Sequence, residues 1–192
     1  MKISKSRGFT LIELVVTIVI IATLSVVAIP KYFSYQRDAN LSRADAAFAS
    51  FKTAVGLFHN KWLVEGEPDS THSVGYGQGD VYPSEAGFPI SVDGAPNPQH
   101  PVSGQECVEL WHALMDVDLT IRDMNTTGTI LPSDTDIVAW YNTSNECTYH
   151  YTTGFDLHER MPLMKYAPLT GMIKITDGAN NAAAPEPEAD SR

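Results

Sequence analysis

The chain has 192 residues, 43% of them hydrophobic, and its 23 acidic and 13 basic side chains give a formal net charge of −10 at pH 7. This length fits one small folded domain, and the acidic balance disfavours nonspecific nucleic-acid binding, which depends on lysine and arginine clustered against phosphates. We therefore expect no nucleic-acid partner, although a local basic patch remains compatible with this composition.

An apolar segment with a single charge lies close to the N-terminus. Residues 9–29 are uncharged except for Glu13, and they follow a short basic head, residues 1–8. As a helix this run would be roughly 30 Å long, the thickness of the hydrocarbon core of a bilayer. A carboxylate there costs about 2.5 to 3.5 kcal/mol on insertion scales, so Glu13 needs either an escape to the interface or a partner.

The residues on either side of this run help to distinguish it from a secretory signal peptide. The run is too long for a typical signal-peptide core, and no small-x-small cleavage site follows it. The residues Arg7-Gly8-Phe9-Thr10-Leu11-Ile12-Glu13 resemble the prepilin signature of type IV pilins and type II secretion pseudopilins. The resemblance implies that prepilin peptidase cuts between Gly8 and Phe9, that Phe9 is then N-methylated, and that Glu13 pairs with the N-terminal amine of a neighbouring subunit. An uncleaved signal anchor is the alternative.

The charges also predict an orientation in the membrane. Removal of the leader, residues 1–8, would leave 10 basic against 23 acidic side chains, a formal charge of −13. The leader cations all precede the apolar run, so the positive-inside tendency predicts a cytoplasmic head and an exported domain after Pro30. We expect a single-pass protein of the bacterial inner membrane with a periplasmic domain, which becomes extracellular when a filament is assembled.

The helix is expected to continue to about residue 64. Pro30 removes one backbone hydrogen bond and should bend or locally melt the helix between a membrane half, residues 9–30, and an amphipathic half, residues 31–64. Seven apolar residues then recur at steps of three and four: Leu41, Ala44, Phe48, Phe51, Val55, Phe58 and Trp62. A stripe so rich in aromatic residues predicts packing on a sheet rather than a coiled coil.

Residues 65–106 are expected to form an extended connection. Gly66 is a plausible helix stop, and seven glycines and six prolines between Gly66 and Glu106 exclude any long regular element. Apolar residues within the region, such as Val74, Val81 and Ile90, favour a loop packed on the domain over a disordered linker.

Residues 107–177 should contain a short helix and a sheet. Ser103 and Glu106 have the spacing of a capping box, which predicts a helix start there. Residues 137–141 and 147–152 are β-prone and read as a hairpin. Residues 129–131 and 172–176 are candidates for further strands. The predicted fold class is α+β, with an antiparallel sheet of about four strands covered on one face by the long helix.

The two cysteines, Cys107 and Cys147, lie in the part predicted to be exported. In an oxidising periplasm an isolated pair indicates one disulfide, worth about 4 kcal/mol in the chain-entropy model. The alternatives fit less well, because the pair lacks the spacing of a zinc site and no C-x-x-C redox motif is present.

No catalytic or cofactor motif is apparent, and the six histidines are scattered along the chain. We expect no enzyme, no catalytic residue and no cofactor. Residues 116–118 and 134–136 each carry two aspartates, but neither has the pattern of a calcium loop, so no metal site is predicted. Residues 178–192 are acidic and lack large apolar side chains, which predicts a disordered tail.

Features beyond the leader resemble the mannose-sensitive haemagglutinin (MSHA) subgroup of type IV pilins. They are Asn60-Lys61-Trp62, Gly87-Phe88-Pro89, Cys107 in the first turn of a tryptophan-containing short helix, and Cys147-Thr148-Tyr149-His150-Tyr151. The resemblance implies the type IV pilin fold and a pilus subunit used in attachment to surfaces, with other pilin subunits and the pilus assembly machinery as partners. The large, irregular domain favours a minor over a main subunit. A type II secretion pseudopilin and a signal-anchored periplasmic binding or enzymatic domain are the alternatives.

Overall fold

The computed structural model describes residues 9–77, 79–92, 94–96, 103–141, 145–157 and 159–176. Two predicted segments, the leader at residues 1–8 and the tail at residues 178–192, lie outside the described residues. The chain forms two compact units, Met1–Ala39 and Asn40–Arg192.

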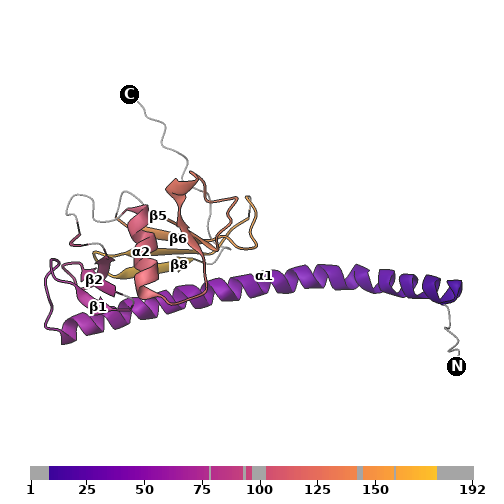
Figure 1. Cartoon of the computed structure of the whole chain (residues 1–192), viewed down its shortest axis with the longest axis horizontal. Coiled ribbons are helices and arrows are strands. Elements are labelled where there is room, and N and C mark those ends of the chain that lie inside the picture. Colours follow the sequence, from indigo (N-terminus) through magenta and orange to yellow (C-terminus); the bar gives the residue numbers. More distant parts are fainter. Residues whose placement is uncertain are drawn as a thin grey trace, which may run out of the picture. The chain divides into compact units, whose positions relative to one another are not determined.

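One long helix, α1 (Leu11–Val64), contributes to both units (Figure 1), which confirms the predicted long N-terminal helix. Gly66 has a φ of +86°, which is easy for glycine. Its N–H donates to the Leu63 carbonyl at 3.2 Å, and the Glu67 N–H donates to the Trp62 carbonyl at 3.0 Å. This pair of bonds is a Schellman motif, so the predicted stop at Gly66 is confirmed.

The predicted stripe on α1 forms the centre of the second unit. Of its seven residues, all but Leu41 are buried, and Leu41 packs against the same core while partly exposed. The ring of Phe51 stacks on Trp111 with 5.4 Å between centroids, and it contacts Tyr149 at 5.3 Å and Tyr166 at 5.5 Å. The amphipathic half of α1 therefore packs on a sheet, as expected.

A five-stranded sheet lies against this half of α1, in the order β4-β5-β6-β7-β8 (Figure 1). Its strands are β4 (Ile121–Asp123), β5 (Ile137–Tyr141), β6 (Cys147–Tyr151), β7 (Leu163–Ala167) and β8 (Met172–Thr176). The pair β4 and β5 is parallel and the other pairs are antiparallel. The predicted hairpin, now β5 and β6, and the predicted strand β8 are confirmed. The sheet has five strands rather than about four.

The prediction of a strand at residues 129–131 is wrong. The carbonyls of Thr129 and Ile130 accept hydrogen bonds from the Arg122 guanidinium, at 3.0 and 3.3 Å, instead of pairing with a neighbouring strand. Pro132 follows directly after a cis peptide bond and has no N–H for a ladder.

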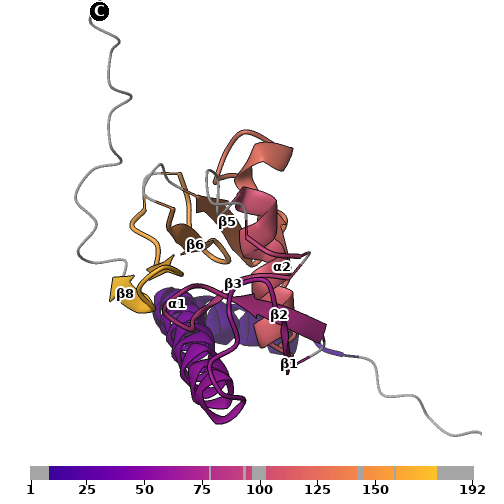
Figure 2. The same cartoon turned by 90° about the vertical axis from the view of Figure 1, so that its left-hand side faces the viewer.

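The connecting region contains a small antiparallel sheet of β1 (Val74–Tyr76), β2 (Gly79–Pro83) and β3 (Pro89–Ser91). Val74 and Val81 are fully buried and Ile90 is nearly so, which confirms a packed connection. Figure 2, which looks along α1 from its Val64 end, shows β8 on one side of the helix and α2, β1 and β2 on the other.

The short helix α2 (Gly104–Leu114) begins with the predicted capping box. The Glu106 N–H donates to the Ser103 hydroxyl at 3.2 Å, and the Ser103 N–H donates to the Glu106 carboxylate at 2.5 Å. Two buried tyrosines tie the elements together, because the Tyr149 hydroxyl donates to the Cys107 carbonyl and the Tyr166 hydroxyl donates to the Pro89 carbonyl.

Candidate functional site

The first unit presents an apolar helical surface. From residue 9 to residue 39 every side chain is exposed except the partly exposed Ser25, and several large apolar residues are more than half exposed, among them Leu11 at 80% and Val26 at 74%. Water-exposed apolar surface of this extent indicates a surface that is covered by a membrane or by partners. Among the described residues, α1 alone is a helix long and apolar enough to cross a membrane.

The polar side chains of this segment bond to their own helix. The hydroxyls of Thr17, Thr23 and Ser25 donate to backbone carbonyls one turn earlier, at 2.8, 2.9 and 2.7 Å. Such bonds leave little unsatisfied polarity for an apolar environment. Pro30 lies within α1 and cannot donate a hydrogen bond to the carbonyl of Val26. The predicted bend there stays a prediction.

Glu13, the single charge of the run, caps its own helix. The Thr10 N–H and hydroxyl donate to one Glu13 carboxylate oxygen at 2.9 and 2.7 Å, and the Glu13 N–H donates to the Thr10 hydroxyl at 3.3 Å. This is a capping box with Thr10 as N-cap, a role that the sequence analysis missed although Thr10 and Glu13 have the spacing that identified Ser103 and Glu106. The carboxylate therefore has a partner within its own chain.

The predicted site residues lie in two groups. Gly8 falls outside the described residues, and Phe9 is 79% exposed just before α1. Cys107 of α2 and Cys147 of β6 are joined by a disulfide with 5.6 Å between their Cα atoms, which confirms the predicted bridge. It closes a separation of 40 residues in the second unit.

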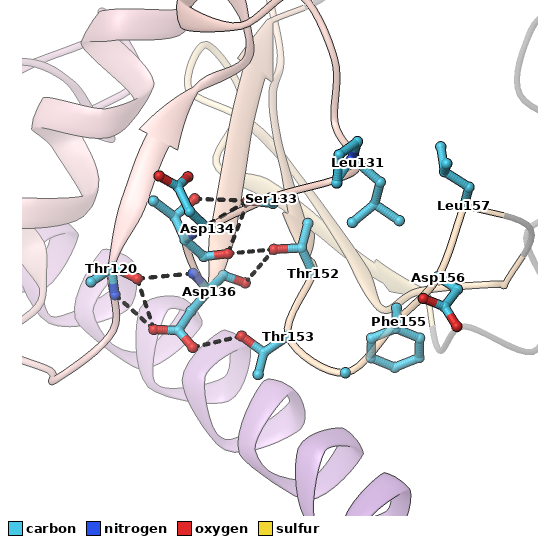
Figure 3. A pocket seen from close by; sticks show the side chains of 13 residues that line it. Thr120, Leu131, Ser133, Asp134, Asp136, Thr152, Thr153, Phe155, Asp156 and Leu157 are labelled. Atoms are coloured by element: carbon cyan, nitrogen blue, oxygen red, sulfur yellow. Dashed lines mark hydrogen bonds between the residues drawn. The ribbon is translucent and has the colours of Figure 1, made fainter.

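A hollow of about 700 Å³ in the second unit lies between two loops, residues 131–136 and 152–157 (Figure 3). Its central carboxylate, Asp136, accepts hydrogen bonds from the Thr120 hydroxyl at 2.9 Å and from the Thr153 hydroxyl at 2.6 Å. Arg43 of α1 lies 3.7 Å from the same carboxylate. Partial burial raises the pKa of Asp136, but the hydrogen bonds from Thr153 and Thr120 and the Arg43 charge outweigh it and lower the pKa.

This network fastens the sheet to α1 and contains no catalytic set. The Asp136 carboxylate oxygens accept hydrogen bonds from threonine hydroxyls. The Asp134 side chain is 90% exposed and lies 3.9 Å from the Arg122 guanidinium. Within the described part of the chain, no three histidine, cysteine, aspartate or glutamate side chains are grouped so that they could hold a metal ion. The hollow is thus a polar depression whose central carboxylate, Asp136, already accepts hydrogen bonds from neighbouring threonines.

His150 makes the stability of the second unit sensitive to mild acid. Burial, and secondarily the Lys165 charge, lower the pKa of His150 from 6.5 to about 4. Between these values the unfolded chain binds a proton that the folded chain excludes, so stability is full above pH 6.5 and falls as the pH is lowered towards 4. We expect the unfolding midpoint of the wild type to drop more between pH 7 and pH 5 than that of His150→Leu, as followed by thermal circular dichroism. Equal drops would contradict a His150 side chain that stays neutral in the folded chain.

The N-terminal segment matches a known sequence motif. Residues 3–29 match the prokaryotic N-terminal methylation motif. The matched run contains Gly8, Phe9 and Glu13 and extends to the border of Pro30. This motif and the long helix packed on a mainly antiparallel sheet together correspond to the type IV pilin fold.

Several curated proteins are similar to the same part of the chain. The chain is 53% identical over 53 residues to the prepilin peptidase-dependent protein D of Escherichia coli, which covers 28% of this chain and 36% of the relative. It is 42% identical over 67 residues to the type IV major alpha-pilin of Moraxella bovis, covering 34% and 42%. It is 39% identical over 72 residues to the type IV major pilin protein PilE1 of Neisseria gonorrhoeae, covering 36% and 41%. The chain thus spans less than half of these relatives, and no solved structure matches it.

Proposed function

We propose that this protein is a structural subunit of a type IV pilus of the MSHA type, in a minor rather than a main role, and that the filament serves attachment to surfaces. The observation that carries the proposal is the exposed apolar half of α1, which has one carboxylate, Glu13, and begins within a methylation motif. Such a helix needs a membrane before assembly and neighbouring helices after it.

In this proposal the N-terminal segment is made competent for assembly by processing. Prepilin peptidase cuts between Gly8 and Phe9, and the new amine of Phe9 is methylated and remains cationic. Glu13 then exchanges its bonds with Thr10 for the amine of a neighbouring subunit. Both charges lie beside apolar surface, where pairing removes the cost of leaving each one alone.

The same proposal sets location and partners. Residues 9–30 span the inner membrane with the second unit in the periplasm, and the pilus assembly machinery draws subunits from the membrane into an extracellular filament. The Cys107–Cys147 disulfide supports an exported domain, because such bridges persist in oxidising compartments. It also favours a pilus over a type II secretion pseudopilus, whose major subunits generally lack this bridge.

The N-terminus of the mature protein tests the proposal. Mass spectrometry of the protein purified from membranes should give a first peptide that begins with N-methylated Phe9, whereas a Gly8→Val variant should keep residues 1–8. The variant controls for cleavage by unrelated proteases, because only a peptidase that reads Gly8 depends on it. An intact leader in the wild-type protein would overturn the pilin proposal in favour of a signal-anchored periplasmic domain.

A further inference from the structure

Four side chains form one row across the five-stranded sheet, on the face that α1 does not cover. Trp140 of β5 is paired with Thr148 of β6, Thr148 with Lys165 of β7, and Lys165 with Lys174 of β8. Directly paired residues point to the same side of a sheet, so all four point away from α1. Thr148 is buried at 5% exposure, whereas the other three are partly or fully exposed. The residues that alternate with them are buried in the core on the opposite face: Ala139, Tyr149, Met164 and Tyr166.

The row ends in two lysines that stand directly opposite each other. Lys165 and Lys174 are both exposed, and neither has a carboxylate partner in the described part of the chain. Like charges at directly opposed positions destabilise a strand pair. The pair is also a local concentration of positive charge on a chain whose net charge is −10. A bound anion would remove the repulsion.

The other end of the row offers an aromatic surface. The chain has three tryptophans, of which Trp62 and Trp111 are buried at 8% and 1% exposure, whereas Trp140 is partly exposed. The Trp140 side chain makes no hydrogen bond with the residues that the structure describes, so its indole N–H is available to a ligand. An indole combines a large apolar face with one polar donor, which suits a ring that has both C–H and hydroxyl groups.

We propose that the accessible residues of this row, Trp140, Lys165 and Lys174, bind an acidic polysaccharide whose sugar rings carry carboxylate groups, while the buried Thr148 lies between them. The two ammonium groups hold a carboxylate, and the indole packs against a neighbouring sugar ring. Two lysines suit separated carboxylates better than the continuous phosphates of a nucleic acid, whose binding needs a longer basic surface.

This site would give the filament its attachment chemistry. Only the step from binding to attachment rests on the proposed function; the binding itself follows from the sheet. The overall negative charge of the chain opposes a polyanion, so a single copy binds weakly, and a filament with many copies gains by multivalency.

The test measures binding of a fluorescently labelled oligogalacturonate to the full chain in detergent micelles, by fluorescence anisotropy. We expect saturable binding that weakens as salt is raised, and at least tenfold weaker binding of the methyl-esterified oligomer, which keeps the rings and loses the charges. No saturable binding, or equal binding of the ester, would overturn the proposal. So would tighter binding of a single-stranded DNA of equal charge.

Two variants separate ligand binding from folding. Lys174→Glu places a carboxylate opposite Lys165, so we expect its unfolding midpoint to rise by about 1 to 3 °C while binding weakens at least tenfold. Trp140→Leu should weaken binding at least threefold. Lys52→Glu makes the same charge change at an exposed position of α1 and should bind like the wild type.

The variants also have outcomes that contradict the site. Unchanged binding by Lys174→Glu, or an equal loss in Lys52→Glu, would show that net charge rather than this row governs binding. None of these results bears on the mature N-terminus, so a failure here leaves the pilin proposal to be judged by the N-methylated Phe9.

Discussion

Replacing Glu13 by leucine is expected to reduce filament yield at least tenfold while the protein remains in the inner membrane. Leucine leaves the run at residues 9–29 without any charge, which favours insertion, but it removes the carboxylate that pairs with the amine of a neighbouring Phe9 in the proposed assembly. The measurement compares the protein in sheared surface filaments with the protein in the membrane fraction, by immunoblotting.

Two further variants distinguish pairing from capping, since Glu13 also caps its own helix through Thr10. Glu13→Gln keeps an acceptor for the Thr10 N–H and loses the charge, so it should fail like leucine. Thr10→Val loses the capping hydroxyl and keeps the carboxylate, so it should assemble. Normal filaments from Glu13→Gln, combined with failure of Thr10→Val, would show that the cap and not the charge pair is required.

Features set by local sequence could be predicted. The stripe on α1, the end of that helix at Gly66 and the start of α2 at Ser103 each depend on residues within a few positions of one another. The hairpin of β5 and β6 follows from two β-prone runs close in sequence. The disulfide could be predicted for a different reason, because a chain with two cysteines has one possible internal pair.

Features that depend on contacts between residues far apart in the sequence could not be predicted. Strand β4 has three residues and is a strand because it pairs in parallel with β5, which no local pattern indicates. The wrong strand at residues 129–131 has suitable residues, but its carbonyls are taken by Arg122, seven and eight positions away. The row of Trp140, Thr148, Lys165 and Lys174 likewise can be recognised only once the strand register is known.

The strongest prediction on stability concerns Phe51, which has no exposed surface and lies at the centre of the second unit. Phe51→Ala is expected to lower the free energy of unfolding by about 3 to 5 kcal/mol, because the cavity removes ring contacts from both α2 and the sheet. The rings that lose their neighbour are Trp111, Tyr149 and Tyr166. The measurement is urea unfolding of the full chain in micelles, followed by near-ultraviolet circular dichroism, which reports on packed aromatic rings.

Leu57→Ala provides the matched control on the same helix. Leu57 is 54% exposed and lies outside the buried stripe, so its truncation should change the free energy of unfolding by less than about 0.5 kcal/mol. The two substitutions change helix propensity in the same direction, so their difference isolates the buried contacts of Phe51. A loss below about 1 kcal/mol for Phe51→Ala would mean that α1 and the sheet are not held together by this aromatic cluster. The Arg43–Asp136 network would then have to provide most of that attachment, and Arg43→Met would become the more damaging change.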